Sequence, residues 1–100
     1  MRRACAAIAL GVAACAFVPA ANPRLDEARQ AYRAAASDPD VVRLAPRELA
    51  AAREALDLAV RASDTLQDPA EVDHLAYLAR QRAAISRELA AQRALSTRPR

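Results

Sequence analysis

The polar side chains best spaced for joint chemistry are His74, Tyr77 and Gln81, within the strongest helical pattern of the chain. On a helix, positions i, i+3 and i+7 stack along one side. Such a strip could be a contact surface, a proton-transfer pair or a hydrogen-bonded edge of a helix bundle. Because one histidine without a nucleophilic partner falls short of a catalytic constellation, the structural interpretation is favoured and no catalytic residue is assigned.

Other ligand chemistry has little support in the sequence. The chain has one histidine and two cysteines, and its carboxylates are not clustered at metal-ligand spacing, so no metal site is expected. The only glycine is Gly11, which excludes a glycine-rich phosphate loop. Aromatic residues make up 3% of the chain, too few for a base-stacking platform. No cofactor is expected.

The charge balance also argues against nucleic acid as a partner. The formal net charge is +3, carried by arginine alone because the sequence has no lysine. Removal of Arg2 and Arg3 with an N-terminal leader would leave 13 arginines against 12 acidic residues. A nearly neutral domain lacks the basic surface that nucleic-acid binding requires.

Residues 1–21 follow the plan of a bacterial secretion signal: two arginines, an apolar run and then small residues. The run is shorter than the about 20 residues that a membrane-spanning helix needs. The tetrapeptide VAAC, which ends at Cys15, resembles a lipobox, in which the cysteine is lipidated and becomes the first residue. The favoured interpretation is a lipoprotein signal peptide over 1–14 and a lipid on Cys15.

Ordinary cleavage after Ala20 or Ala21 is the alternative; it would remove 1–20 or 1–21 and release a soluble periplasmic domain. A lipid on Cys15 would instead hold the domain at a membrane surface. In similar bacterial lipoproteins the residue after the cysteine influences sorting. Here it is Ala16 and not aspartate, so the resemblance implies the outer membrane, facing the periplasm.

The rest of the chain predicts an all-α fold, either an antiparallel helical hairpin or a three-helix bundle. Proline and capping residues start helical patterns, and no strand pattern occurs. The expected helices are about 24–37, 46–66 and 69–95. A tether over 15–23 precedes this helical domain (24–95), and a flexible tail over 96–100 follows it.

Two packing expectations follow from the apolar pattern. Large side chains favour one packing face on the third helix: Leu75, Leu78, Ile85 and Leu89, flanked by Ala79 and Ser86. Arg82 lies within this face, so its stem is expected to pack while its guanidinium reaches an acid or water. The many alanines predict antiparallel helices that meet through alanine seams, with the second and third helices forming the main hairpin.

Three stretches resemble a known family: DEARQAYRAAASDPDV, APRELAAAREALDLAV and EVDHLAYLARQRAAI. They are similar to the domain of unknown function 4398 (DUF4398), and the resemblance covers about 24–95. Its members are small alanine-rich helical proteins of the Gram-negative envelope, often with lipoprotein signals and sometimes fused to an OmpA-like domain. The sequence stops at Arg100 without such a domain, so peptidoglycan binding is not carried over. The family implies no catalytic residues.

The sequence thus predicts a non-enzymatic envelope lipoprotein that acts as a structural or protein-interaction module. Its partners would be the membrane, through the lipid on Cys15, and either another envelope protein or a second copy of itself. One alternative is a small periplasmic enzyme or regulator that uses His74 and Tyr77. The other is a soluble secreted helical module without lipid.

Overall fold

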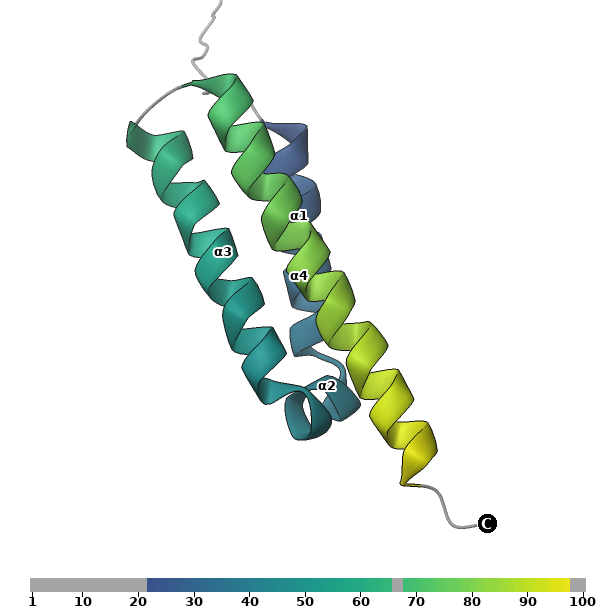
Figure 1. The fold of residues 1–100 in the computed structure, drawn as a ribbon. Coiled ribbons are helices and arrows are strands. Elements are labelled where there is room, and N and C mark those ends of the chain that lie inside the picture. Colours follow the sequence, from purple (N-terminus) through teal and green to yellow (C-terminus); the bar gives the residue numbers. More distant parts are fainter. Residues whose placement is uncertain (1–21, 66–67, 98–100) are drawn as a thin grey trace, which may run out of the picture.

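The chain folds into four α-helices in the computed structural model, which describes residues 22–65 and 68–97 (Figure 1). The helices are α1 (Pro23–Ala36), α2 (Pro39–Leu44), α3 (Pro46–Thr65) and α4 (Pro69–Ser96). Neither range contains a strand, which confirms the predicted all-α class. The three predicted helices are α1, α3 and α4, and α2 is a short helix in the first connection. Cys15 and the predicted signal peptide lie outside the described residues.

Each helix begins at a proline, whose missing N–H costs nothing in the first turn. Polar side chains cap three of these starts. The Asn22 Oδ1 accepts hydrogen bonds from the N–H groups of Arg24 and Leu25, at 3.0 and 3.1 Å. Asp38 and Asp68 each accept one from the N–H group two residues on, at 2.9 and 3.1 Å. The start that the sequence predicts at Asp68 is therefore confirmed.

The predicted main hairpin is also confirmed, because α3 and α4 run antiparallel and share the most extensive interface (Figure 1). The first helix, α1, packs along α4 and less extensively on α3. The short α2 lies at the end of the bundle where α3 begins, against the C-terminal half of α4. Three long helices thus form a bundle that α2 closes at one end.

Alanine dominates the core of the described bundle, as the alanine-seam prediction requires. Within residues 22–65 and 68–97, the other buried apolar residues are Leu25, Val41 and Val72. One buried cluster lies toward the α2 end and comprises Ala35, Val41, Ala45, Ala52, Ala83 and Ala90. The second lies toward the start of α1 and comprises Leu25, Ala28, Ala59, Ala76 and Ala79. Small side chains let the helix backbones approach closely, so contact between backbones replaces the usual interlocking of large side chains.

The predicted packing face of α4 is wrong by about one residue position, or about 100° around the helix. Its buried residues are Val72, Ala76, Ala79, Ala83, Ser86 and Ala90. Leu78 and Ile85 are instead 38% and 49% exposed, and Arg82 is exposed. Leucines cannot fit between helices that meet through alanine, so they lie at the rim of the interface. The Ser86 hydroxyl is tolerated inside because it donates to the Ala83 carbonyl at 2.7 Å.

Arg93 ties the C-terminal part of α4 to the junction between α2 and α3. Its Nη1 donates to the Leu44 carbonyl oxygen at 2.6 Å. Its two terminal nitrogens each donate to one carboxylate oxygen of Glu48, both at 3.3 Å. The hydrogen bond from Arg93, helped by a backbone hydrogen bond, lowers the pKa of Glu48 below its ordinary value of 4.5.

This contact gives a pH-dependent prediction. Because the pKa of Glu48 is lower in the folded chain than in the unfolded chain, its stabilising effect is complete above pH 4.5 and is lost as the pH falls below that value. The difference in unfolding free energy between wild type and Glu48→Gln should therefore shrink between about pH 6 and about pH 3. Urea titrations at several pH values measure it. Glu88→Gln is the matched control for the loss of one negative charge, because Glu88 is exposed and has no ion pair among the described residues.

Candidate functional site: the open face of the α3–α4 hairpin

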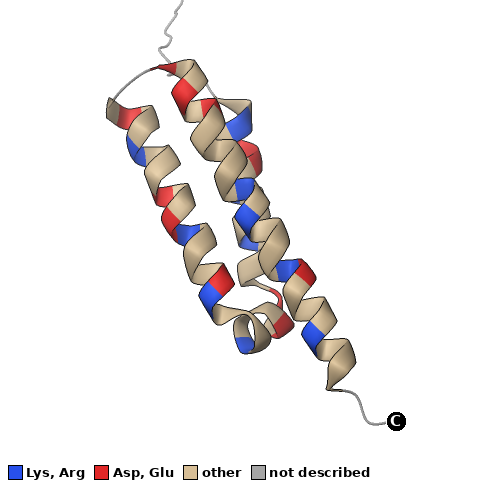
Figure 2. Ribbon diagram, in the orientation of Figure 1, with Lys and Arg blue, Asp and Glu red and all other residues tan. Residues whose placement is uncertain are grey.

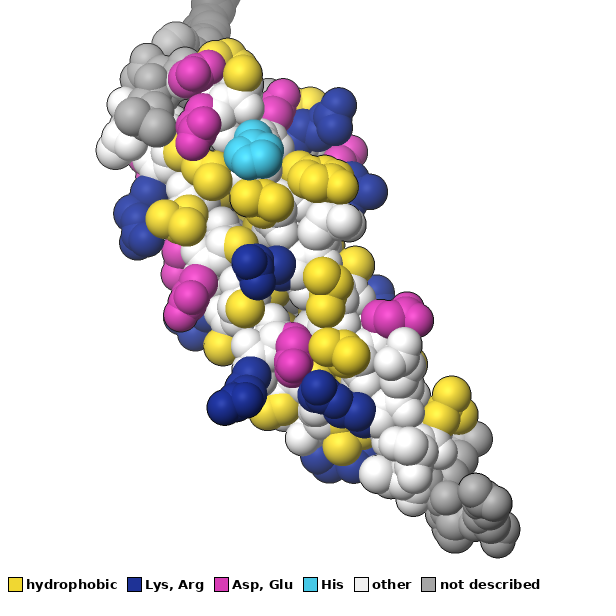
Figure 3. All heavy atoms as spheres, viewed as in Figure 1, with side chains coloured by type: hydrophobic (Ala, Val, Ile, Leu, Met, Phe, Trp, Pro, Cys, Tyr) yellow, Lys and Arg dark blue, Asp and Glu magenta, His cyan; other side chains and the backbone are white. Residues whose placement is uncertain are grey.

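The predicted strip of His74, Tyr77 and Gln81 lies on the solvent side of α4. All three residues are exposed, Tyr77 by 52%. Figure 3 shows His74 in cyan at the surface, with apolar side chains beside it. None of the side-chain hydrogen bonds within 22–65 and 68–97 involves these residues. The interpretation as a hydrogen-bonded bundle edge is therefore not supported, and the strip is a solvent-exposed surface.

A larger feature lies beside this strip, on the side of the hairpin that faces away from α1. Three large apolar side chains are exposed there: Leu58 of α3 by 50%, Leu78 of α4 by 38% and Ile85 of α4 by 49%. Leu75 and Leu89 are half-buried and continue the row on α4. Figure 3 shows apolar side chains running along this face of the hairpin. Exposed large side chains that gather on one face are typical of an interaction site.

An ion pair on the other side of α4 shows which side of this helix faces α1. The Arg80 guanidinium lies 3.2 Å from the Glu27 carboxylate of α1. Since each residue turns a helix by about 100°, Leu78 and Ile85 project well away from Arg80 and hence away from α1. The first helix therefore leaves this side of the hairpin uncovered.

Two charged residues flank the exposed apolar side chains. Glu54 lies one turn before Leu58 on α3, and Arg82 lies one turn after Leu78 on α4. Both are exposed, and neither forms an ion pair within the part of the chain that the structure describes. We define the open face by seven residues: Glu54 and Leu58 of α3, with Leu75, Leu78, Arg82, Ile85 and Leu89 of α4.

The α3 part of this face was not predicted from the sequence. The α3 residues that repeat at three and four positions are Leu49, Ala52, Leu56, Ala59 and Ser63. Leu58 departs from this stripe, because it follows Leu56 by only two positions. That departure was the available signal. The α4 part was recognised as an apolar row but was assigned to the interior.

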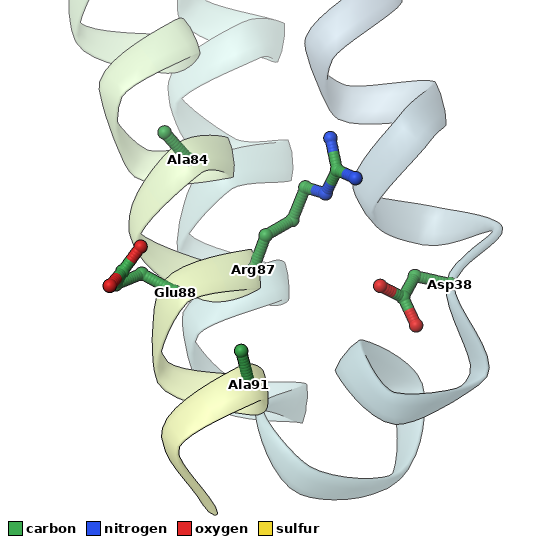
Figure 4. A pocket seen from close by; sticks show the side chains of 5 residues that line it. All are labelled: Asp38, Ala84, Arg87, Glu88 and Ala91. Atoms are coloured by element: carbon green, nitrogen blue, oxygen red, sulfur yellow. The ribbon is translucent and has the colours of Figure 1, made fainter. Parts of the chain in front are cut away.

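A second feature is a shallow hollow between α4 and the turn from α1 to α2 (Figure 4). Its lining residues are Asp38, Ala84, Arg87, Glu88 and Ala91. Figure 4 shows Arg87 and Asp38 on opposite sides of the gap, and Glu88 directed away from them. The hollow is open to solvent and lacks the apolar enclosure of small-molecule sites, so it carries no binding assignment.

Charges of both signs are interspersed along α1, α3 and α4 (Figure 2). In the described ranges, no group of three or more His, Cys, Asp or Glu side chains is placed to hold a metal ion. Among the helices of those ranges, none combines the length and apolarity needed to cross a bilayer.

These features define a small all-α protein whose alanine-packed helices leave one apolar face uncovered. The family model for the domain of unknown function DUF4398 matches residues 23–99, so the chain belongs to that family. The resemblance expected from the sequence is thereby confirmed. No curated protein and no solved structure matches the chain.

Proposed function

We propose that the chain is a non-enzymatic interaction module of the cell envelope, anchored by a lipid on Cys15 to the periplasmic side of the outer membrane. The observation that carries the anchor is the position of Cys15, which follows small residues at the end of the apolar run. The first helix begins at Pro23, so only a short tether separates it from that cysteine. A lipid there would place the bundle close to the membrane surface.

The interaction role rests on the open face. Leu58, Leu78 and Ile85 expose large apolar side chains on one side of a bundle whose own core is mostly alanine. These side chains would gain stability by binding a partner, since each apolar Å² removed from water contributes about 25 cal/mol. The envelope setting is proposed because residues 1–21 have the pattern of a secretion signal.

Intact-mass analysis of the protein extracted from membranes tests the anchor. We expect a mature chain that begins at Cys15 and carries a diacylglyceryl or triacyl adduct. Cys15→Ser should abolish the adduct and remove the chain from the membrane fraction, because the thiol of Cys15 is the proposed attachment point of the lipid. Cys5→Ser is the matched control and should leave the mass and the location unchanged, since Cys5 would be discarded with the signal peptide.

A wild-type chain with an unmodified N-terminus at Ala21 or Asn22 would contradict the anchor. It would indicate ordinary cleavage and a soluble periplasmic module. Retention of Cys5 in the mature chain would contradict both cleavage interpretations.

A further inference from the structure

We propose that the open face binds a second copy of this chain and forms a parallel two-fold dimer. The inference rests on the proposed function, because it names the partner of the interaction module. The two-fold axis runs along the helices within the interface. Such a rotation places α3 of one copy against α4 of its partner, at the same height along the bundle, and repeats that contact on the other side of the axis.

The two helices of the open face have complementary side-chain sizes. Beside Leu58, α3 presents the half-buried Ala51 and Ala55, which leave room between turns. The facing α4 presents the exposed Leu78 and Ile85 in a row of large side chains. In a parallel dimer Ile85 of α4 lies near the height of Ala51 in the partner. Leu78 lies near the height of Leu58, where the two leucines would pack against each other. Although the two copies are parallel, α3 of one copy and α4 of its partner run in opposite directions. Antiparallel helices in bundles pack in this way, with large side chains inserted into gaps beside small ones.

An antiparallel dimer fits the same face poorly. It would set α4 against α4, with large side chains opposing large side chains. Arg82 lies at the middle of the α4 row, halfway between Leu75 and Leu89. The two Arg82 guanidinium groups would approach one another near the axis, and like charges that face each other destabilise an interface.

Charge complementarity favours the parallel arrangement. Ala52 of α3 and Ala83 of α4 share one core cluster, and Ala59 and Ala79 share the other. Glu54 lies between the two alanines of α3, and Arg82 lies between the two of α4. The two charges therefore lie at nearly the same height.

In the parallel dimer, α3 of one copy faces α4 of the other at that height. Glu54 of each copy then lies opposite Arg82 of its partner, so the dimer holds two intermolecular ion pairs. Both side chains are available, because neither forms an ion pair within the described ranges. Pairs of this kind specify orientation more than they add affinity.

The size of the face sets the expected strength. A helix of 20 residues, the length of α3, is about 30 Å long, and two adjacent helices are about 20 Å wide. Each copy could then bury about 600 Å², a total of about 1,200 Å², at the lower end for specific interfaces. The dimer should therefore be reversible, with a Kd in the micromolar range. The parallel arrangement also places both α1 starts at one end, as a common membrane anchor requires.

Sedimentation velocity on the purified full-length chain tests the dimer over a wide concentration range. Wild type should show a monomer–dimer equilibrium. Arg82→Glu and Glu54→Arg should each weaken dimerisation at least about tenfold, because each places like charges opposite one another. The double variant should restore most of the affinity, since it exchanges the two charges across the interface. Wild type, the two single variants and the double variant form a double-mutant cycle, which measures the interaction energy between Glu54 and Arg82.

Matched charge reversals on other sides of the same helices serve as controls. Arg53→Glu on α3 and Arg87→Glu on α4 change the net charge as Arg82→Glu does, but both residues lie away from the open face. They should leave the Kd unchanged. Far-UV circular dichroism should show the same helicity for all variants, because every substituted residue is exposed.

Three results would overturn the dimer: a monomer at all concentrations, a Kd that neither open-face reversal changes, or a double variant as weak as the single variants. Intact-mass analysis determines separately whether Cys15 carries a lipid. A monomeric chain that carries the lipid therefore overturns the dimer alone. A dimeric chain without the lipid overturns the anchor alone.

Discussion

Replacing Ala83 by leucine should lower the free energy of unfolding by about 1–3 kcal/mol. Ala83 is fully buried and shares a core cluster with Ala52 of α3 and Val41 of α2. The interaxial distance of packed helices depends on the side chains at the contact, so a larger side chain must push α3 and α4 apart. That separation weakens the neighbouring contacts along the seam as well.

The matched control is Ala84→Leu, the same change one residue further along α4. Ala84 is exposed and lines the open hollow near Asp38, so leucine should fit there with a change within about 0.5 kcal/mol. Urea unfolding at one fixed protein concentration measures both variants, since self-association would otherwise alter the apparent stability. Equal effects at the two positions would mean that the seam does not pass through Ala83.

The helix starts could be predicted from sequence because local chemistry determines them. A proline at the first helical position has no N–H to leave unpaired, and Asp68 caps free N–H groups through its own carboxylate. Both effects act within a few residues and need no tertiary information. The helical spacing of Leu25, Ala28, Tyr32 and Ala35 likewise predicts the inner side of α1, where Tyr32 is half-buried and the other three are buried.

The interior of α4 could not be predicted by weighting side chains by their hydrophobicity. That criterion selected Leu78 and Ile85, which proved to be half exposed. In this bundle the decisive property is size, because close helix approach selects small residues. Ala76, Ala83 and Ala90 recur every seven residues, and that small-residue period is visible in the sequence. That period, and not the row of large side chains, marks the buried side of α4.

The open face required the tertiary structure for a different reason. Glu54 and Arg82 lie on separate helices, and the sequence does not specify their relative height. The two shared core clusters place the stretch of α3 between Ala52 and Ala59 beside the stretch of α4 between Ala79 and Ala83. With the helices placed side by side in this way, Glu54 and Arg82 lie at nearly the same height along the hairpin. The strip of His74, Tyr77 and Gln81, in contrast, could be placed on one side of a helix from spacing alone.

A second large effect on stability is expected at Leu25, because this side chain is buried between the helices and does not lie at the exposed rim of the interface. Leu25→Ala should lower the free energy of unfolding by about 2–5 kcal/mol. Leu25 is 5% exposed and packs in a cluster whose other members are Ala28, Ala59, Ala76 and Ala79. Among the buried members of that cluster in the described residues, it is the only large side chain, and Leu56, Val60 and Leu75 pack against the cluster from its edge. Its truncation should leave a cavity, because the buried neighbours are alanines whose side chains are too short to fill it.

Leu95→Ala removes the same atoms from a leucine that is 63% exposed near the end of α4, so it separates the effect of burial from that of leucine itself. Its effect should be within about 0.5 kcal/mol. In thermal unfolding, each kcal/mol corresponds to about 4–8 °C for a domain of this size, so Leu25→Ala should lower the Tm by at least about 8 °C. A single transition at the lower Tm would show that α1 unfolds together with the hairpin. Equal Tm values for the two variants would contradict the docking of α1, because Leu25 would then be as free of contacts as Leu95.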